Sequence, residues 1–454
     1  MTATATEVPG ARGPLARRGV GRTRLLVFVA IALGIAAGRI ITYDRSSDAR
    51  SGARSGGDSP AARVERLEEV VRQNPRDVAQ LQALGGAYVQ SVAAGGDVAL
   101  YNDAEAVFER AEELAPGDPR TTVTQGYLAL ARHDFSRARD LGIEAVTADP
   151  FDADALAVTV DAEVELGIYD DAAQHLQQLL DVRPGLAAYS RLSYLRELHG
   201  DVLGARQAFA QAEAAGSSRY DLASIAVLRG KLALNQGDLD EADAHFDRAR
   251  GYVGEPAGAE AGEARLLAAR GDRTGAIAIL ETAIAERPTA EVAILLGDLL
   301  GLEGRTAAAA RADAVVRDLA TEESAAGADV SMELSLFEAD RGNPAPALEL
   351  AESAYAVKPD NVTANITMAW ALRVNGRAPE ALGFVDRALR LGTPDALLHF
   401  RAAAVLADAG QTDRAAAELQ AAFSISPWFS FGHLEEADAL AARLGIDVST
   451  VERS

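Results

Sequence analysis

An alanine recurs along this chain at a nearly constant interval of 34 residues. Ten alanines follow one another at steps of 33 to 38 positions: Ala104, Ala138, Ala172, Ala205, Ala242, Ala276, Ala309, Ala347, Ala381 and Ala415. A glycine stands five residues before eight of them: Gly167, Gly200, Gly237, Gly271, Gly304, Gly342, Gly376 and Gly410. An internal period of this length indicates stacked copies of one supersecondary unit. The chain is therefore expected to fold as an array.

Two further columns have the same period. Small residues stand seven positions before the glycine: Gly126, Ser193, Gly230, Ala264, Gly297, Ser335, Ala369 and Ala403. Prolines stand seventeen positions after it: Pro116, Pro150, Pro184, Pro288, Pro359 and Pro427. Glycine can end one helix in a left-handed conformation, alanine lets a second helix approach the first, and proline ends the second helix. The pattern predicts a helical hairpin in each unit.

This order of small, glycine, alanine, bulky and proline positions resembles the tetratricopeptide repeat, a 34-residue helical hairpin. The resemblance covers roughly residues 62–427, with departures where Ala99 and His133 replace the glycine and where Gly142 and Asp313 replace a bulky residue. It implies an all-α fold, a right-handed α-solenoid of about ten hairpins. Residues 428–454 are expected to form a C-terminal capping helix and tail, with Trp428, Phe429 and Phe431 holding the cap to the last repeat.

Composition excludes several classes of function. The chain has no cysteine, which removes disulfides, thiolate metal sites and lipid attachment through an N-terminal cysteine. Residues 1–62 carry nine arginines and four acidic residues, a net charge of +5, so the rest of the chain carries −28. An acidic body of this size repels phosphate backbones, and nucleic acid is not expected as a partner.

The N-terminus carries a membrane signal. A basic tail, residues 1–24, precedes an apolar segment at residues 25–43, which Arg39 interrupts. Nineteen residues suffice for one crossing if Arg39 reaches the headgroups, so we expect a single-pass anchor with the repeats outside the cytoplasm. The alternative is a signal peptide that is cleaved to release a secreted protein. Residues 44–61 read as a flexible linker.

Catalytic signatures are scarce. The sequence has no phosphate-binding loop, no G-x-G-x-x-G after a strand, no H-E-x-x-H and no G-x-S-x-G. The repeats fill nearly all of the chain after residue 62, so we expect no enzyme, cofactor or metal. The acid-rich stretch NQGDLDEADAHFDRA, residues 235–249, has the density of a metal site, but its acids fall on the outer face of a second helix.

The inner face of the solenoid is the candidate binding surface. Residues six positions before the glycine are expected to point toward the concave side. Six residues of this column form the candidate partner-binding groove: Tyr127, Tyr194, Lys231, Arg265, Asp298 and Trp370. The aromatic residues would anchor a peptide or helix, and Lys231 and Arg265 would pair with its carboxylates. The alternative is a face that is merely solvated or packed against neighbouring helices.

The resulting hypothesis is a non-catalytic scaffold for a protein or peptide partner, displayed from a membrane anchor. Two alternatives stay open. The chain could be an accessory or regulatory subunit of a membrane transporter or envelope-assembly complex, or, less in keeping with its length, an enzyme with its active site in the groove.

Overall fold

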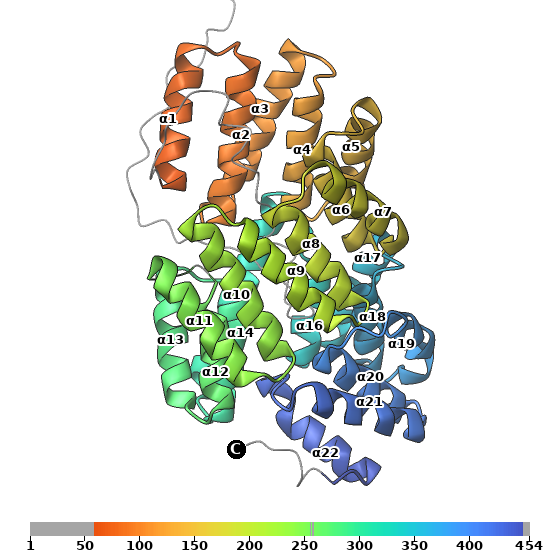
Figure 1. Cartoon of the computed structure of the whole chain (residues 1–454). Helices are drawn as coiled ribbons and strands as arrows, with labels where there is room; N and C mark the ends of the chain where they lie inside the picture. The colour runs from red at the N-terminus through yellow and green to blue at the C-terminus, as the bar shows by residue number, and fades with distance from the viewer. Residues whose placement is uncertain (1–58, 255, 257, 448–454) are drawn as a thin grey trace, which may run out of the picture.

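The computed structural model describes residues 59–254, 256 and 258–447, and their regular elements are helices (Figure 1). The first half holds α1 (Pro60–Gln73), α2 (Val78–Ala93), α3 (Leu100–Leu114), α4 (Pro119–Ala131), α5 (Phe135–Ala148), α6 (Ala153–Leu166), α7 (Tyr169–Val182), α8 (Leu186–Leu198), α9 (Val202–Ala215), α10 (Arg219–Asn235) and α11 (Leu239–Val253). The second half holds α12 (Glu260–Ala269), α13 (Arg273–Glu286), α14 (Ala290–Leu302), α15 (Thr306–Ala325), α16 (Ser331–Asp340), α17 (Pro344–Val357), α18 (Val362–Val374), η3 (Ala378–Ala381), α19 (Leu382–Ala388), α20 (Ala396–Asp408), α21 (Thr412–Ile425), η4 (Phe431–His433) and α22 (Leu434–Leu444).

The helices pair as ten antiparallel hairpins. After the leading helix α1, the hairpins run from α2–α3 to α20–α21, with η3 and α19 together forming the second arm of the ninth, and α22 follows as the cap. The predicted all-α solenoid of about ten hairpins is confirmed. The linker was expected to reach residue 61, but α1 already begins at Pro60, where the Ser59 hydroxyl caps it by accepting from the amide of Ala62.

The alanine column marks the contact between the two helices of each hairpin. Nine of its ten alanines are buried, and Ala309 is the exception. The small residue on the first helix has a partner on the second: a Cβ added to Gly230 would stand 2.7 Å from the ring of Phe246. A bulky side chain therefore fills the space that the small residue leaves.

The turns within the hairpins depend on left-handed backbone. All eight glycines of the glycine column have positive φ, between 70° and 86°. His133 occupies the same turn with φ 58° and is the one non-glycine residue with positive φ in the described ranges. In the first hairpin, where Ala99 holds the glycine position, Gly95 makes the left-handed turn instead with φ 93°.

Two repeats are longer than the rest. The 37-residue step after Ala205 and the 38-residue step before Ala347 predict lengthened connections near residues 216–220 and 322–329. In the structure the extra residues mostly lengthen helices instead: α10 has 17 residues and α15 has 20. Asp313 of α15 takes a bulky position and pairs with Arg341 at 2.9 Å. A polar side chain thus replaces the apolar contact, and the nearby Ala309 is only partly buried.

Successive turns of the solenoid touch each other along a line that we call the inter-turn seam. It joins the turns after α4, α6, α8 and α10 to the connections before α16, α18, α20 and α22. The His133 ring nitrogen Nδ1 lies 3.0 Å from the carbonyl oxygen of Asp329, and the Asn361 amide donates to the carbonyl of Glu165 at 3.0 Å. Each of these pairs is 196 positions apart, between five and six repeat lengths. In Figure 1, α17 and α18 lie beside α7 and α8.

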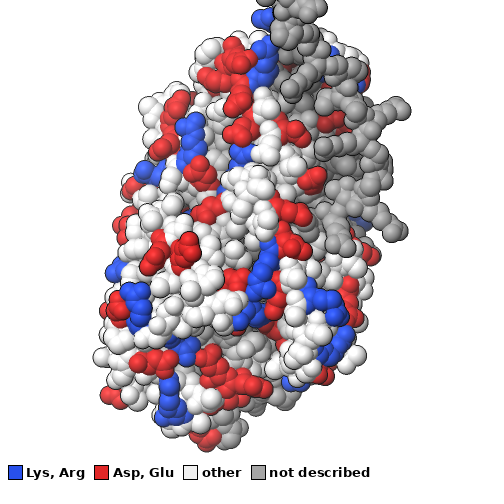
Figure 2. Space-filling model, turned by 180° about the vertical axis from the view of Figure 1, so that it is seen from behind, with Lys and Arg blue, Asp and Glu red and all other residues white. Residues whose placement is uncertain are grey.

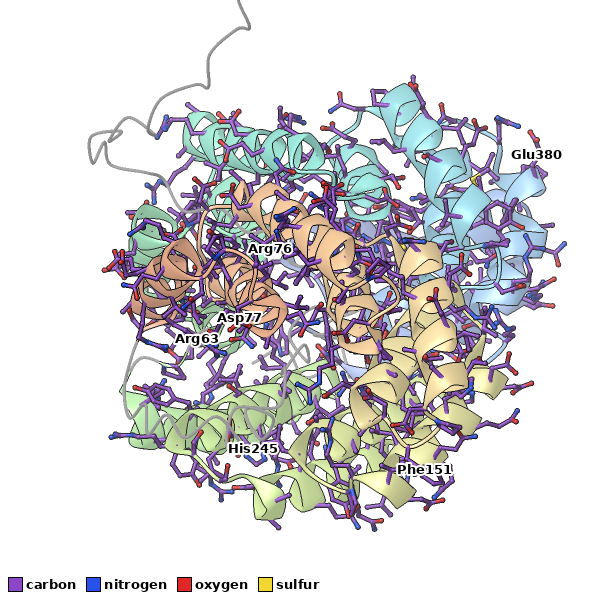
Figure 3. The ribbon with its side chains drawn as sticks, turned by 90° about the horizontal axis from the view of Figure 1, so that it is seen from above. Arg63, Arg76, Asp77, Phe151, His245 and Glu380 are labelled. Carbon is purple, nitrogen blue, oxygen red and sulfur yellow. The ribbon has the colours of Figure 1, made fainter. Side chains whose placement is uncertain are left out.

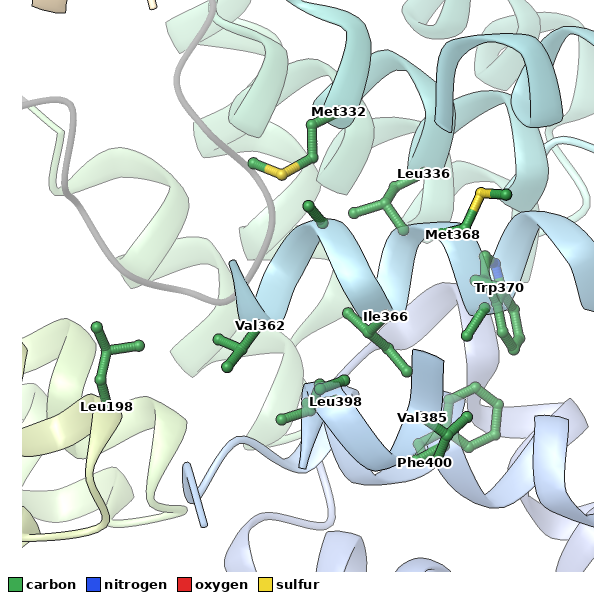
Figure 4. Close-up of a cluster of buried hydrophobic side chains, with 14 of the residues drawn as sticks. Leu198, Met332, Leu336, Val362, Ile366, Met368, Trp370, Val385, Leu398 and Phe400 are labelled. Carbon is green, nitrogen blue, oxygen red and sulfur yellow. The ribbon is translucent and has the colours of Figure 1, made fainter. Parts of the chain in front are cut away.

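The seam is apolar beneath its hydrogen bonds. One core cluster contains residues of α6–α8 together with residues of α16–α22. Figure 4 shows part of it, with Leu198 of α8 in the same cluster as Val362 of α18 and Leu398 of α20. The interior is therefore shared between repeats far apart in sequence.

The capping segment also bridges two groups of repeats. Phe429 stacks on Phe400 of α20, with ring centroids 5.1 Å apart, which confirms the predicted contact with the last repeat. Phe431 instead packs into a second cluster built by α12–α14, and Trp428 and Leu434 lie against the same cluster. The prediction that all three aromatic residues hold the last repeat was therefore wrong for Trp428 and Phe431.

Candidate partner-binding groove

The six predicted groove residues all lie on the first helices of hairpins, but the structure does not bring them to one surface. Tyr127 belongs to α4, Tyr194 to α8 and Trp370 to α18. The other three, Lys231 of α10, Arg265 of α12 and Asp298 of α14, line a single cavity of about 160 Å³, which we call the groove pocket.

The groove pocket has walls from five hairpins and the cap. Its lining residues are Lys231, Asn235, Arg265, Glu291, Ile294, Leu295, Asp298, Leu336, Phe337, Asp340, Arg341, Asp395, Ala396, Leu397, Arg401, Phe429, Ser430, Phe431 and His433. Gly432 lets the cap approach Asp298 closely. A Cβ added at Gly432 would stand 3.0 Å from the carboxylate of Asp298. The pocket is thus completed by a segment that follows the last repeat.

Ion pairs run along the pocket wall. The Lys231 ammonium contacts both oxygens of Glu291 at 2.8 and 2.9 Å. Arg341 pairs with Asp298 at 2.8 Å, and burial nevertheless raises the pKa of Asp298 to about 6. Arg401 pairs with Asp340 at 2.9 Å. Each pair joins different helices, so the charges connect repeats as well as line the pocket.

Trp370 was predicted to be an exposed anchor, and this prediction was wrong. Its side chain is 2% exposed and donates from Nε1 to Asp340 at 2.7 Å. The guanidinium groups of Arg373 and Arg401 lie 4.6 and 5.6 Å from its ring, and His433 of the cap stacks at 5.6 Å. Trp370 stabilises the interior contact with the cap.

The two predicted tyrosine anchors are also inside. Tyr127 is 4% exposed, and burial raises its pKa well above the usual value. Tyr194 is partly buried against the core cluster that crosses the seam. The next superhelical turn covers this part of the inner face, which agrees with the alternative of a face packed against neighbouring helices.

The covered interior also holds carboxyl groups. Burial and Asp395 raise the pKa of Glu197 to about 8, and burial raises that of Glu165 to about 7 although Lys358 opposes the shift. The Oε2 atom of Glu333 is buried with no hydrogen-bond partner among the described residues. Glu165 and Glu197 therefore hold their protons to a higher pH in the folded protein than exposed glutamates do.

The pocket residues Phe337, Asp340, Arg341, Arg401 and His433 were missed in the sequence. They do not lie in the column six positions before the glycine, which was used for the prediction. The superhelical closure that brings them together leaves no local pattern in the sequence. Phe429, by contrast, had been singled out as a cap residue.

The acid-rich stretch of α11 forms contacts between repeats. Asp240 and Asp243 both pair with Arg270, at 2.9 and 2.6 Å, and Asp238 pairs with Arg206. Asp238 is the N-cap residue of α11, but its side chain makes no cap hydrogen bond. No group of three or more histidine or acidic side chains in the described ranges is arranged to hold a metal ion.

The outer surface carries both signs of charge. On the face shown in Figure 2, acidic and basic side chains alternate. Phe151, 77% exposed, lies on the outside of the molecule before α6 (Figure 3). Among the helices of the described part, none is long and apolar enough to span a bilayer; the apolar segment 25–43 lies outside that part.

Ten stacked hairpins, nine of which bury the same alanine between their two helices, define an α-solenoid, a class of repeat protein. A model of the tetratricopeptide repeat family matches residues 123–181, 158–220, 227–289 and 338–396. The chain belongs to the tetratricopeptide repeat family, whose members generally serve as non-catalytic scaffolds that bind other proteins. No curated protein matches it.

Several solved structures are similar. A thermophilic tetratricopeptide repeat protein of Thermus thermophilus is 22% identical, covers 44% of this chain and 100% of its own, and has a TM-score of 0.36. A tetratricopeptide repeat protein of Parabacteroides merdae is 15% identical, with coverages of 68% and 99% and a TM-score of 0.35. Yeast Tom70 is 14% identical, with coverages of 81% and 95% and a TM-score of 0.34.

Proposed function

We propose that this protein is a non-catalytic scaffold that holds a segment of a partner protein at the groove pocket. The observation that carries the proposal is the convergence of Lys231, Arg265 and Asp298 on one cavity. Its wall also contains the apolar side chains of Ile294 and Leu397, which are only partly buried. A cavity with apolar walls and a few placed charges suits a recognised side chain.

The proposal includes the cellular arrangement. Residues 25–43 anchor the chain in a membrane, and the repeats lie outside the cytoplasm. The support is in the sequence: an apolar stretch long enough for one crossing, with arginines on both sides. The acidic body then faces its partner from the membrane surface.

Site-directed photocrosslinking in the native host tests the scaffold. A photoreactive p-benzoylphenylalanine at Ile294, in the pocket wall, is expected to crosslink one specific partner. The same group at Phe151 is the control, because that side chain is exposed on the outer surface. Identical products from the two positions, or none at Ile294, would refute partner binding at the pocket.

The absence of native cysteine allows a clean test of topology. A single cysteine at Ser424, an exposed position on α21, should react with a membrane-impermeant maleimide in intact cells. A cysteine at Thr2 should react only after lysis. The reverse pattern would place the repeats in the cytoplasm.

A further inference from the structure

The charges of the groove pocket are compensated with one exception. Three of its four lysine and arginine side chains are in ion pairs: Lys231 with Glu291, Arg341 with Asp298 and Arg401 with Asp340. His433 adds no charge near neutral pH, because burial lowers its pKa further below the usual value of 6.5. The remaining cation is Arg265.

Arg265 has no carboxylate partner in the described part of the chain. Its Nη1 atom donates to the amide oxygen of Asn235 at 3.3 Å, a long hydrogen bond for a guanidinium that has five N–H donors. Burial lowers the pKa of Arg265, although the negative charges of Glu291 and Asp395 oppose this shift. A partly buried guanidinium that is held by one long hydrogen bond to an amide oxygen can gain strongly from an added anion.

The fourth carboxylate of the wall, Asp395, does not need a cationic ligand. It stands at the N-cap of α20, and its Oδ1 accepts the amide hydrogen of Leu398 at 2.6 Å. The positive end of that helix therefore compensates it. Burial also raises its pKa, so protonation is easier than for an exposed aspartate.

The size of the pocket limits the ligand. A volume of about 160 Å³ is similar to that of an engineered cavity that holds one benzene molecule, so one side chain fits inside the pocket. Ile294, Leu336, Leu397 and Phe429 provide apolar contacts for the methylene groups of such a side chain.

We propose that the groove pocket takes a single acidic side chain of the partner, a glutamate or aspartate, whose carboxylate pairs with Arg265. This inference rests on the proposed function and names the feature of the partner that the pocket recognises. Arg265 supplies the specificity, and the neighbouring ion pairs fix the shape of the wall.

Ligand-observed saturation-transfer NMR on the full chain in detergent tests this recognition. The probes are N-acetyl-glutamate methylamide and its neutral counterpart N-acetyl-glutamine methylamide, which differ only in the group that meets Arg265. We expect the glutamate probe to bind with a dissociation constant about tenfold or more below that of the glutamine probe, because the hydrogen bonds are charge-assisted. Equal binding, or no binding of either probe at millimolar concentration, overturns the inference.

Variants locate the effect. Arg265→Met should abolish the preference for the glutamate probe, and Arg265→Lys should retain part of it. Arg270→Met is the matched control, because Arg270 pairs with Asp240 and Asp243 outside the pocket. A preference that survives in Arg265→Met contradicts the inference. The comparison of probes on the unmodified chain does not depend on whether a variant folds. Crosslinking at Ile294 can succeed even if neither probe binds, so the scaffold proposal and the acidic-side-chain proposal can fail separately.

Discussion

The Thr393 hydroxyl donates a hydrogen bond of 2.6 Å to the carbonyl oxygen of Leu198, 195 positions earlier in the chain. Thr393 is 1% exposed and lies between α19 and α20, whereas Leu198 ends α8. This contact belongs to the inter-turn seam, and it joins repeats that an open solenoid would keep apart.

Replacing Thr393 with valine tests the strength of that contact. The valine keeps the volume and removes the donor, which leaves a buried carbonyl without this partner. We expect the free energy of unfolding to fall by about 1–3 kcal/mol in chemical denaturation. Thr282→Val is the control, because that hydroxyl bonds within its own exposed helix surface. Equal losses in both variants would show that the seam bond contributes nothing of its own.

Two glycines allow the cost of backbone strain to be measured separately from the cost of a steric clash across the inter-turn seam. Gly167 and Gly376 both have positive φ, 83° and 73°. An added Cβ at Gly167 would stand 2.3 Å from the backbone of Asp360 across the seam, while at Gly376 it would meet nothing within 4 Å. Gly376→Ala should cost about 1–2 kcal/mol from strain alone. Gly167→Ala should cost clearly more in the same denaturation assay; a similar cost would mean that the seam yields without penalty.

The stability of the fold should decline as the pH rises. Burial and Asp395 raise the pKa of Glu197 from 4.5 to about 8, so the folded chain holds this proton more tightly than the unfolded chain. Its contribution is fully present below pH 4.5 and is lost as the pH rises through about 8, with a limiting slope of about 1.4 kcal/mol per pH unit. Denaturation at pH 5, 7 and 9 measures this decline.

Glu197→Gln should flatten that pH profile and raise the stability at pH 9 relative to the unmodified chain. Glu352→Gln, at an exposed position on α17, is the matched control and should leave the profile unchanged. A steep profile that persists in Glu197→Gln would assign the pH dependence to other buried groups, such as Glu323, whose pKa is raised to about 9.

The two cap phenylalanines should protect different repeats. Phe431→Ala removes a side chain packed on α12–α14, and Phe429→Ala removes one stacked on Phe400 of α20. Hydrogen–deuterium exchange is expected to accelerate in residues 290–302 for the first variant and in residues 396–408 for the second, each with a loss of about 3–5 kcal/mol. Acceleration confined to the cap in both variants would contradict the bridging role.

The repeat architecture could be predicted because each hairpin depends on local residues. Gly230 and Phe246 meet within one hairpin, so their spacing along the chain was enough to indicate the contact. The closure of the solenoid depends on small rotations between hairpins that accumulate over several repeats. The spacing of residues within one repeat does not indicate the accumulated rotation. The pairing of Asn361 with Glu165 therefore could not be predicted from the sequence.

The closure of the solenoid also explains why only some of the predicted groove residues line the pocket. Lys231, Arg265 and Asp298 were selected by repeat position, and the structure places them in one pocket. Tyr127 and Trp370 were selected by the same rule, but the solenoid closes over them and they are buried. Position in a repeat predicts which helix face a side chain occupies, whereas its exposure depends on the neighbouring superhelical turn.

The inter-turn seam has a consequence for how the molecule unfolds. In an open solenoid each repeat touches only its neighbours, so the ends can melt while the middle stays folded. Here residues at or just after the ends of α4, α6 and α8 are bonded to residues 195 or 196 positions later, so loss of an end also removes contacts from the opposite half. The ten hairpins should therefore unfold in one cooperative transition, and two spectroscopic probes placed in distant repeats should report the same midpoint.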